Sequence, residues 1–295
     1  MADPQRGYRV GLLLVVFSTV AWSTAGYFTR LIVLDSWTIL FWRGVFGGAT
    51  AFAYLGLRHR GGLAREVRRI GRPGLWFSVV SALGMTTFLT ALKLTTVAHF
   101  AIIYATIPFV AAVMAWVFLR ERSSASTLIA SAAACLGVVV MVGAGAGEGG
   151  TLGDVLSVIT TLLMGVMIVM ARRRRGIPMI PAAGLSALLA AAFALPFAHV
   201  WPINTPNLLE LALFGATNMG LGLILFMQGS QLVPAAESAL IGSLEAPLAP
   251  FWVWLAFGET PVAATIVGGA IVMAAVLAHV SFGARRPLPS PAPVA

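Results

Sequence analysis

Apolar segments of about 20 residues recur from one end of the chain to the other, and this recurrence constrains the fold more than any other feature. A helix of about 20 residues is about 30 Å long, which matches the hydrocarbon core of a bilayer. The chain is 59% hydrophobic and only 10% charged, whereas water-soluble domains carry roughly 25% charged residues. We therefore expect an all-α polytopic membrane protein. The ten expected spans are residues 10–33, 37–57, 74–93, 97–119, 125–143, 153–171, 179–200, 208–232, 235–257 and 261–281.

The basic residues indicate how these spans are oriented. The net charge of +9 would suit a nucleic-acid partner, but the arginines lie in short clusters between apolar segments, so no such partner is expected. With ten spans and a cytoplasmic N-terminus, all of the 19 Lys and Arg residues except Arg30, Arg43 and Lys93 fall on the cytoplasmic side. This bias is the usual orientation signal of membrane proteins. We expect a multi-pass protein of a bacterial-type inner (plasma) membrane with both termini in the cytoplasm.

The two halves of the chain resemble each other. Residues 82–101 align with residues 220–239 at an offset of 138 residues, and Glu121 aligns with Glu259 at the same offset. Each half holds five spans, and because five is odd the second copy must enter the membrane inverted, as in many secondary transporters. Chance similarity between apolar helices is the alternative. The expected organisation is a cytoplasmic tail at 1–9, a first five-helix repeat at 10–145, an outer linker at 146–152, a second repeat at 153–283 and a cytoplasmic tail at 284–295.

Several motifs are similar to the EamA module of the drug/metabolite transporter superfamily. The first half has a Trp followed by small residues at Trp22, the stretch ALKLTTVAHFAI at 91–102, and the proline-interrupted stretch IPFVAAVMAWVFLRE at 107–121. The second half matches with QLVPAAESALIGSLEAPLAPFWVWLAFGE at 231–259. The resemblance covers about residues 10–283. Among members of the family, the chain most resembles the YddG-type bacterial exporters of aromatic amino acids.

The resemblance implies two inverted five-helix repeats around a central cavity, with the first four helices of each repeat enclosing it. It also implies ATP-independent transport without a cofactor. Glu121 and Glu259 match the boundary glutamates of the family and are expected to be structural, bonding helix ends or arginines. One departure from the family pattern is visible, because Pro108 lies 13 residues before Glu121 whereas Pro247 lies 12 before Glu259.

Glu245 is the most unusual residue because it lies inside an apolar span. Counted from Pro234 at 1.5 Å per residue, it lies roughly 16 Å along the helix, near the middle of the bilayer. A carboxylate there costs on the order of 3 kcal/mol, so it must face a polar cavity, pair with a cation or be protonated. We expect a cavity carboxylate or proton-coupling site; a structural Glu neutralised by a neighbour is the alternative. Pro247 and Pro250, like Pro108, are the expected helix-breaking hinges because each removes a helical hydrogen bond.

Arg43 is the second charge expected deep in a span, about seven residues from the outer end of the second helix. A buried guanidinium can bind a substrate carboxylate bidentately or pair with Glu245. The alternative is that it extends toward the outer surface, as we expect for Arg30 and Lys93. Other residues with polar groups in the spans are candidates for lining the substrate cavity, although each alone is more often a packed or interfacial residue; they are Trp22, Tyr27, His99, Tyr104, Asn218, Gln228 and Ser238.

Small residues predict where helices pack closely. Gly44 and Gly48 have the G-x-x-x-G spacing, and small residues recur in 130–137 and 268–275. Such stripes allow the backbones of membrane helices to approach each other.

The sequence contains no Walker A motif, no H-E-x-x-H or G-x-S-x-G motif and no Cys/His ligand cluster, so neither a cofactor nor a metal is expected. We expect a secondary transporter that exports small amphipathic metabolites, particularly aromatic amino acids, by alternating access. Proton coupling through Glu245 and uncoupled downhill export are both open. Its partners are the small-molecule substrate and the lipid bilayer, and a monomer is plausible. The alternatives are a nucleotide-sugar or sugar-phosphate carrier, a channel, and an intramembrane enzyme using Glu245 with His99.

Overall fold

The computed structural model describes residues 4–58, 63–143, 150–173, 178–201 and 203–283, and every regular element within them is helical. The first half contains α1 (Pro4–Ser23), α2 (Ala25–Leu31), α3 (Ser36–Arg58), α4 (Leu63–Arg68), α5 (Gly71–Leu94), α6 (Val97–Tyr104), α7 (Ile107–Leu119) and α8 (Ala125–Gly143). The second half contains α9 (Thr151–Arg173), α10 (Met179–Ala194), η1 (Leu195–Phe197), α11 (Thr205–Phe214), the π-helix η2 (Gly215–Gly222), α12 (Leu223–Ser230), α13 (Ala235–Gly242), α14 (Glu245–Phe257) and α15 (Ala263–Gly283).

Within the described residues, nine helical segments are long and apolar enough to cross a membrane. They correspond to all the expected spans except 37–57. That segment is nevertheless a helix, α3, of 23 residues, which is long enough to cross the hydrocarbon core. Its composition is less apolar because it carries Arg43, two tryptophans and several glycines. The chain is therefore a polytopic helical membrane protein.

Two segments differ from the expected boundaries. Helix α1 begins at Pro4, so most of the expected tail 1–9 is helical, and α4 lies within the cytoplasmic loop expected at 58–73. The C-terminal tail 284–295 and residues 144–149, which include most of the expected linker 146–152, lie outside the described part of the chain.

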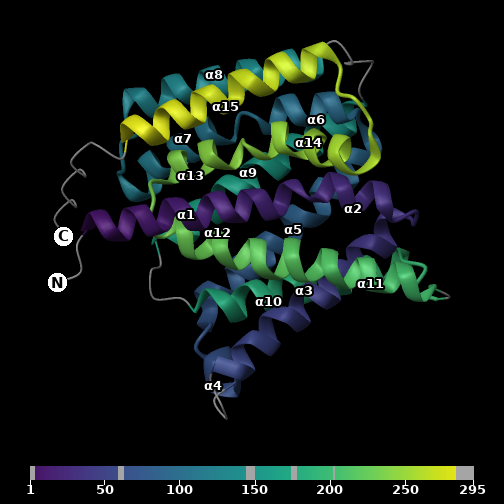
Figure 1. The fold of residues 1–295 in the computed structure, drawn as a ribbon. Coiled ribbons are helices and arrows are strands. Elements are labelled where there is room, and N and C mark those ends of the chain that lie inside the picture. Colours follow the sequence, from purple (N-terminus) through teal and green to yellow (C-terminus); the bar gives the residue numbers. More distant parts are fainter. Residues whose placement is uncertain (1–3, 59–62, 144–149, 174–177, 202, 284–295) are drawn as a thin grey trace.

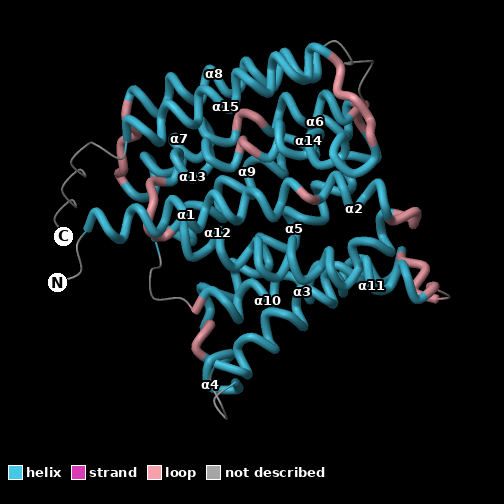
Figure 2. Tube along the Cα trace, in the orientation of Figure 1, coloured by secondary structure: helices cyan, strands magenta, loops and turns pink. Residues whose placement is uncertain are grey.

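Two expected spans are broken into two helices at matching positions, and the span at 10–33 is also interrupted, between α1 and α2. Residues 97–119 form α6 and α7, and residues 235–257 form α13 and α14, so the four helices have bounds that differ by the same 138 residues. Figure 2 shows the breaks as pink turns inside the bundle. Pro108 lies in the first turn of α7, where a missing N–H costs little. Pro247 likewise lies in the first turn of α14, whereas α14 continues through Pro250, so the chain does not break there.

The helices form a bundle with two distinct ends (Figure 1). At one end, which we call the terminal end, α1 begins, α7 and α9 finish, α13 begins and α15 finishes. At the opposite, distal end, α2 and α14 finish while α6 and α9 begin. Helices α8 and α15 pack side by side at one edge of the bundle, and α3 packs on α10 at the other. The main hydrophobic core lies between these edges and includes Val15, Phe77, Ile168, Met227 and Leu240.

Close packing at the small residues is confirmed. A Cβ atom added to Gly137 of α8 would lie 2.7 Å from the carbonyl oxygen of Gly268 of α15, and one added to Gly44 of α3 would lie 2.6 Å from that of Ala187 of α10. Two equivalent glycine contacts hold helices together, one between the two halves of the chain at each of two related positions. Gly11 of α1 packs on Leu232, just beyond α12, and Gly153 of α9 packs on Leu94 of α5. Glycine is needed at these positions because any side chain would separate the helices.

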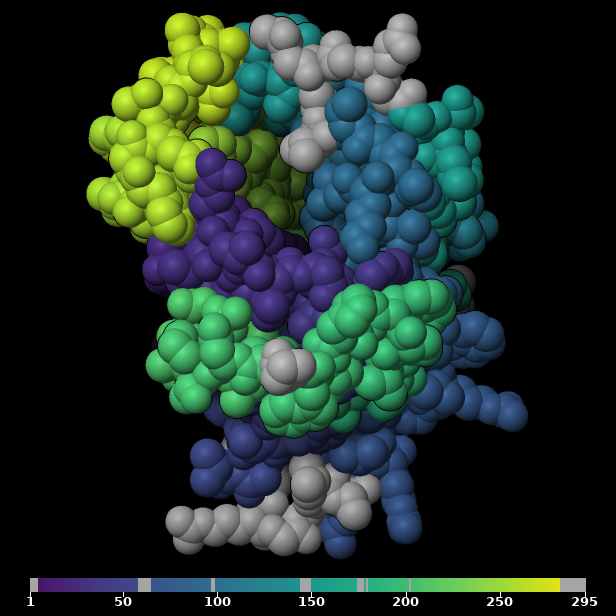
Figure 3. All heavy atoms as spheres, turned by 90° about the vertical axis from the view of Figure 1, so that its right-hand side faces the viewer, coloured from purple at the N-terminus to yellow at the C-terminus, as the bar shows by residue number. Residues whose placement is uncertain are grey.

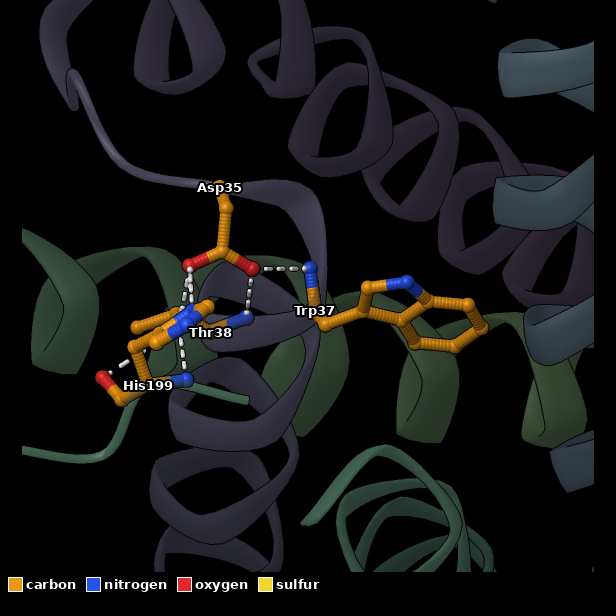
Figure 4. A network of polar contacts seen from close by, with 4 residues as sticks. All are labelled: Asp35, Trp37, Thr38 and His199. Carbon is orange, nitrogen blue, oxygen red and sulfur yellow. Dashed lines mark hydrogen bonds and ion pairs between the residues drawn. The ribbon is translucent and has the colours of Figure 1, made fainter. Parts of the chain in front are cut away.

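Asp35 fixes the start of α3 at the distal end (Figure 4). Its Oδ1 accepts hydrogen bonds from the amides of Trp37 and Thr38, both at 3.0 Å, and its Oδ2 accepts one from the Thr38 hydroxyl at 2.5 Å. The Nδ1 of His199 lies 3.4 Å from the same Oδ2, and the His199 amide donates to the Thr38 hydroxyl at 2.8 Å. An N-cap aspartate thus joins α3 to the segment that follows α10. Partial burial acts to raise the pKa of Asp35, but these hydrogen bonds outweigh it and lower the pKa below its usual value.

Replacing Gly44 with alanine should destabilise the protein, because the new methyl group would meet the Ala187 carbonyl at 2.6 Å. Overpacking of this kind typically costs about 1–3 kcal/mol. We expect the Gly44→Ala variant to unfold at a clearly lower temperature in detergent. Gly56→Ala in the same helix is the matched control, because nothing lies within 4 Å of a Cβ at that position. Equal melting temperatures for the two variants would contradict this packing.

Replacing Asp35 with alanine should remove the cap and lower the stability by about 1 kcal/mol at neutral pH. Because folding lowers the pKa of Asp35, its contribution is complete above the unfolded value of about 3.9 and is lost as the pH falls through the folded value. The difference in melting temperature between wild type and Asp35→Ala should therefore shrink below about pH 4. Thermal unfolding between pH 3 and 7 measures this, and a difference independent of pH would refute the ionised cap.

Candidate functional site

A cavity of about 130 Å³ lies between the broken helices in the middle of the bundle. It is lined from both halves of the chain, by residues of α1, α2, α3, α5, α6, α9, η2, α12 and α14. Five of the residues proposed from the sequence line it together: Trp22, Arg43, Tyr104, Asn218 and Glu245.

Glu245 reaches the cavity because the span breaks just before it. The break falls at Ser243 and Leu244, and Glu245 is the first residue of α14. The free N–H groups of a first helical turn and the helix dipole favour an anion at this position. The Glu245 carboxylate makes no hydrogen bond or ion pair with another residue of the described chain. It is therefore available to a ligand or a proton.

Arg43 lies in the same cavity, on α3. Its Nε is buried and has no hydrogen-bond partner in the described structure, and its Cζ lies 5.1 Å from the centre of the Phe214 ring. A cation over an aromatic face gains modest stabilisation but leaves its N–H donors free. Arg43 and Glu245 attract each other electrostatically but are too far apart for an ion pair. The cavity thus holds two opposite charges, each with unused bonding capacity.

The position of Arg43 depends on the π-helix η2. A Cβ atom added to Gly215 would lie 2.7 Å from the Arg43 carbonyl oxygen, and one added to Gly47 would lie 2.5 Å from the Cβ of Met219. These glycines let α3 approach η2 closely, which brings Arg43 and Asn218 to the same cavity. Single π-helical turns are frequent at functional sites because the extra residue redirects side chains.

Trp22 and Asn218 are mostly bonded to each other's backbone. The Trp22 Nε1 donates to the Asn218 carbonyl at 3.1 Å, and the Asn218 Nδ2 donates to the carbonyls of Ala21 and Trp22 at 3.3 and 3.2 Å. These carbonyls lack helical partners because α1 ends at Ser23. The Trp252 Nε1 donates to the Ser23 hydroxyl at 2.8 Å at the same break. The polar groups of Trp22 and Asn218 therefore stabilise the break between α1 and α2. The surface of these two side chains that faces the cavity is mainly apolar.

The remaining cavity wall is largely apolar. Tyr104 stacks on Phe100 with ring centres 5.2 Å apart and meets Phe88 edge-on at 6.4 Å. Met85, Met164, Met167 and Met219 add flexible side chains that adapt to ligands of different shape. The sequence analysis missed these residues, together with Ser81, whose buried hydroxyl has no partner in the described structure. No pattern marks them, because methionine and serine in an apolar span look like packing residues.

Four proposed residues do not line this cavity. Tyr27 of α2 packs on Phe28 and Phe257 with ring centres 5.1 and 5.6 Å apart. Gln228 of α12 is half-buried. Ser238 of α13 is fully buried, and its hydroxyl has no partner among the described residues. His99 lies at the start of α6, where its Nδ1 is 3.2 Å from both Asp154 oxygens.

A second polar group that the sequence analysis missed lies at the terminal end. The Tyr8 hydroxyl donates to Glu237 Oε1 at 2.5 Å, and His279 Nε2 lies 3.1 Å from the same oxygen. Glu237 and His279 are buried, so this group joins α1, α13 and α15 away from water. The argument applied to Glu245 would have found Glu237, which is another carboxylate within an apolar span.

The boundary glutamates bond to arginines, as expected. Arg172 Nε lies 2.5 Å from Glu121 Oε2 at the terminal end, and Arg30 Nη2 lies 2.6 Å from Glu259 Oε1 at the distal end. Each pair joins one half of the chain to the other. The Arg30 side chain is 60% exposed at the distal end, so it extends to the surface as expected, and it also pairs there with Glu259. No group of three or more His, Cys, Asp or Glu residues that would hold a metal ion occurs among the described residues.

Comparisons with known proteins agree with this architecture. The model of the EamA-like transporter family matches residues 9–143 and again residues 151–280. A curated relative from Archaeoglobus fulgidus, described as an uncharacterized transporter, is 24% identical over 281 residues, covering 92% of this chain and 97% of that protein. A solved structure described only as "Crystal structure of protein" is similar with a TM-score of 0.77 at 20% identity, over 93% of this chain and 97% of that one. At that identity the likeness shows the fold alone.

The two family matches together span most of the sequence, and the described helices include nine candidate membrane spans. The protein is therefore a multi-pass membrane transporter that belongs to the EamA-like transporter family.

Proposed function

We propose that the protein is a secondary transporter of small zwitterionic metabolites, with amino acids and particularly aromatic ones as the first substrate class. The observation that carries this proposal is that two opposite charges, Arg43 and Glu245, line one largely apolar cavity and form no hydrogen bond or ion pair with another described residue. Arg43 binds the substrate carboxylate, because a guanidinium matches it bidentately. Glu245 binds the ammonium group, and the aromatic and methionine side chains contact the apolar part.

The cavity volume bears on the transport cycle. Pockets for small molecules usually have about 300–1,000 Å³, whereas this cavity has about 130 Å³. An aromatic amino acid therefore requires the cavity to widen, which the broken helices allow. We propose that the turns before Pro108 and Pro247 act as hinges for this movement.

The proposed mechanism is alternating access between two inverted five-helix repeats, with α3 completing ten spans. Two observations support the repeat: the family model matches twice, and α6 and α7 are offset by 138 residues from α13 and α14. Its inversion follows from the odd number of spans in each copy. The clustered arginines support a cytoplasmic location for the terminal end, in a bacterial-type inner membrane.

The rival substrate classes fit the cavity less well. A nucleotide-sugar or sugar-phosphate carrier needs several cations for the phosphate charge, and Arg43 is the one cation among the described residues that line the cavity. An intramembrane enzyme using Glu245 with His99 would need these side chains together. Glu245 lines the cavity, whereas His99 pairs with Asp154 outside its lining.

Replacing Arg43 with glutamine should weaken binding of an amino acid about 10- to 100-fold, because a charged hydrogen-bond partner of the carboxylate is lost. Counterflow of radiolabelled phenylalanine into proteoliposomes, competed with unlabelled phenylalanine or phenylalanine amide, measures this. The wild type should prefer the acid, and Arg43→Gln should bind both equally. Arg122→Gln, outside the cavity, is the matched control. An unchanged preference in Arg43→Gln would remove the carboxylate role.

Replacing Glu245 with glutamine should separate proton coupling from substrate exchange. If Glu245 carries the proton, an imposed pH gradient accelerates uptake by the wild type but not by Glu245→Gln, while counterflow without a gradient persists in the variant at a higher half-saturating substrate concentration, because the contact with the ammonium group is weakened. Gradient-driven uptake and equilibrium counterflow in the same vesicles measure the two properties. Wild-type uptake that ignores the gradient would establish uncoupled export.

A further inference from the structure

Helices α6 and α7 of the first half have positions in the sequence that match α13 and α14 of the second half, but the two pairs have unequal environments. Helix α13 corresponds to α6 and helix α7 to α14 at the offset of 138 residues. Every residue of α13 from Ala235 to Ile241 is buried. Among the described side chains of α6, only Phe100 is buried. Five residues of α7 are buried, whereas no residue of α14 is buried. Related sequences thus pack tightly at the terminal end and loosely at the distal end.

The helix contacts show the same difference. Helix α13 packs against α7 at the terminal end, but among the described residues no comparable packing joins α6 to α14 at the distal end. The space-filling view of the distal end is hollowed between the blue atoms of α5 and α6 and the yellow-green atoms nearer the C-terminus (Figure 3). The terminal end is closed in this conformation, and the distal end is open.

An arginine holds the closed end together. Arg172 pairs with Glu121 at 2.5 Å, and its Nη1 also donates to the Gln231 carbonyl at 3.4 Å. Glu121 follows α7 and Arg172 lies at the end of α9, whereas Gln231 lies between α12 and α13. The guanidinium therefore connects the α7–α9 pair to the segment leading into α13. The side chains of Arg172 and Glu121 are only 16% and 25% exposed.

The corresponding ion pair at the open end lacks the third contact. The side chains of Arg30 and Glu259 are 60% and 46% exposed, and within the described residues Arg30 donates only to Glu259. The position related to Gln231 by the 138-residue offset is Lys93, at the end of α5. Its carbonyl is where a second bond from Arg30 would form if α6 and α14 closed together.

We infer that Arg172 acts as a latch, meaning that its hydrogen bond to the Gln231 carbonyl keeps the terminal end closed. Arg30 is the equivalent latch of the distal end, and its second bond is not formed in this conformation. The inference rests on the proposed transport function. When the bundle rearranges, Arg172 releases the Gln231 carbonyl while keeping Glu121, and Arg30 bonds the Lys93 carbonyl while keeping Glu259. At 3.4 Å the bond to Gln231 is long and so is readily exchanged. Each arginine is a positioning residue that acts on the helices and touches no substrate.

The labelling rate of single cysteines tests this latch without any substrate. In a Cys135→Ser background, Ala239→Cys reports on the closed end and Ala101→Cys on the open end; these positions are related by the 138-residue offset. Ala239 is 6% exposed and Ala101 is partly exposed, so a polar maleimide should label position 101 much faster than position 239.

Adding Arg172→Gln should raise the labelling rate at position 239 at least about tenfold and lower it at position 101, because a latch shifts one equilibrium between two states. Arg30→Gln is the matched control and should leave position 239 slow. If Arg172→Gln does not fold, Glu121→Gln, which no longer holds the Arg172 guanidinium where it donates to the Gln231 carbonyl, should give the same opposite changes. An unchanged rate at position 239, or a rise at both positions, would overturn the latch.

Amino-acid counterflow in the same variants keeps this inference separate from the proposed function. Opposite changes in labelling without amino-acid transport by the wild type would leave the latch standing and refute the substrate class. Transport as proposed, with labelling that ignores Arg172→Gln, would refute the latch alone.

Discussion

The structure depends on one constraint, which is that backbone groups removed from water must find partners inside the protein and that charges must face a partner or a polar cavity. The chain meets it by breaking helices where other segments can complete them. The break in α1 leaves carbonyls that the Asn218 side chain satisfies. The break before α14 places Glu245 at a free helix start, facing the cavity rather than lipid. At the first break the contact comes from the other half of the chain, and at the second the cavity is lined from both halves.

This arrangement brings two charges without an ion-pair partner among the described residues into one cavity. Most polar side chains of the spans bond to a carbonyl one turn back in their own helix, as Ser131 and Thr161 do. Arg43 and Glu245 do not, and they share the central cavity. The surrounding phenylalanine, tyrosine and methionine side chains provide a lining of low polarity, which strengthens the electrostatic attraction of these charges for an ionic ligand. The two ends of the bundle then differ mainly in how tightly related helices pack.

Much of the architecture could be read from the sequence. Nine of the ten expected spans meet the length and hydropathy of a membrane helix in the described residues, and the expected close packing at Gly44 and Gly137 is present. The lining of the candidate cavity was predicted in part, since five proposed residues line it while Tyr27, His99, Gln228 and Ser238 do not. Polar residues in apolar spans are conspicuous in a sequence, but their direction around the helix depends on breaks that hydropathy does not locate.

The sequence by itself determined that the chain is a membrane protein and that it has two similar halves. It also determined that Glu245 and Arg43 require a polar environment. These properties follow from composition and from the energy of a charge in hydrocarbon, which do not depend on tertiary contacts. Only the tertiary structure decided that the breaks fall at Ser243 and Leu244 rather than at Pro250, and that His99 pairs with Asp154. It also decided that α13 is buried while its counterpart α6 is mostly not, because related segments acquire different surroundings only when the helices pack.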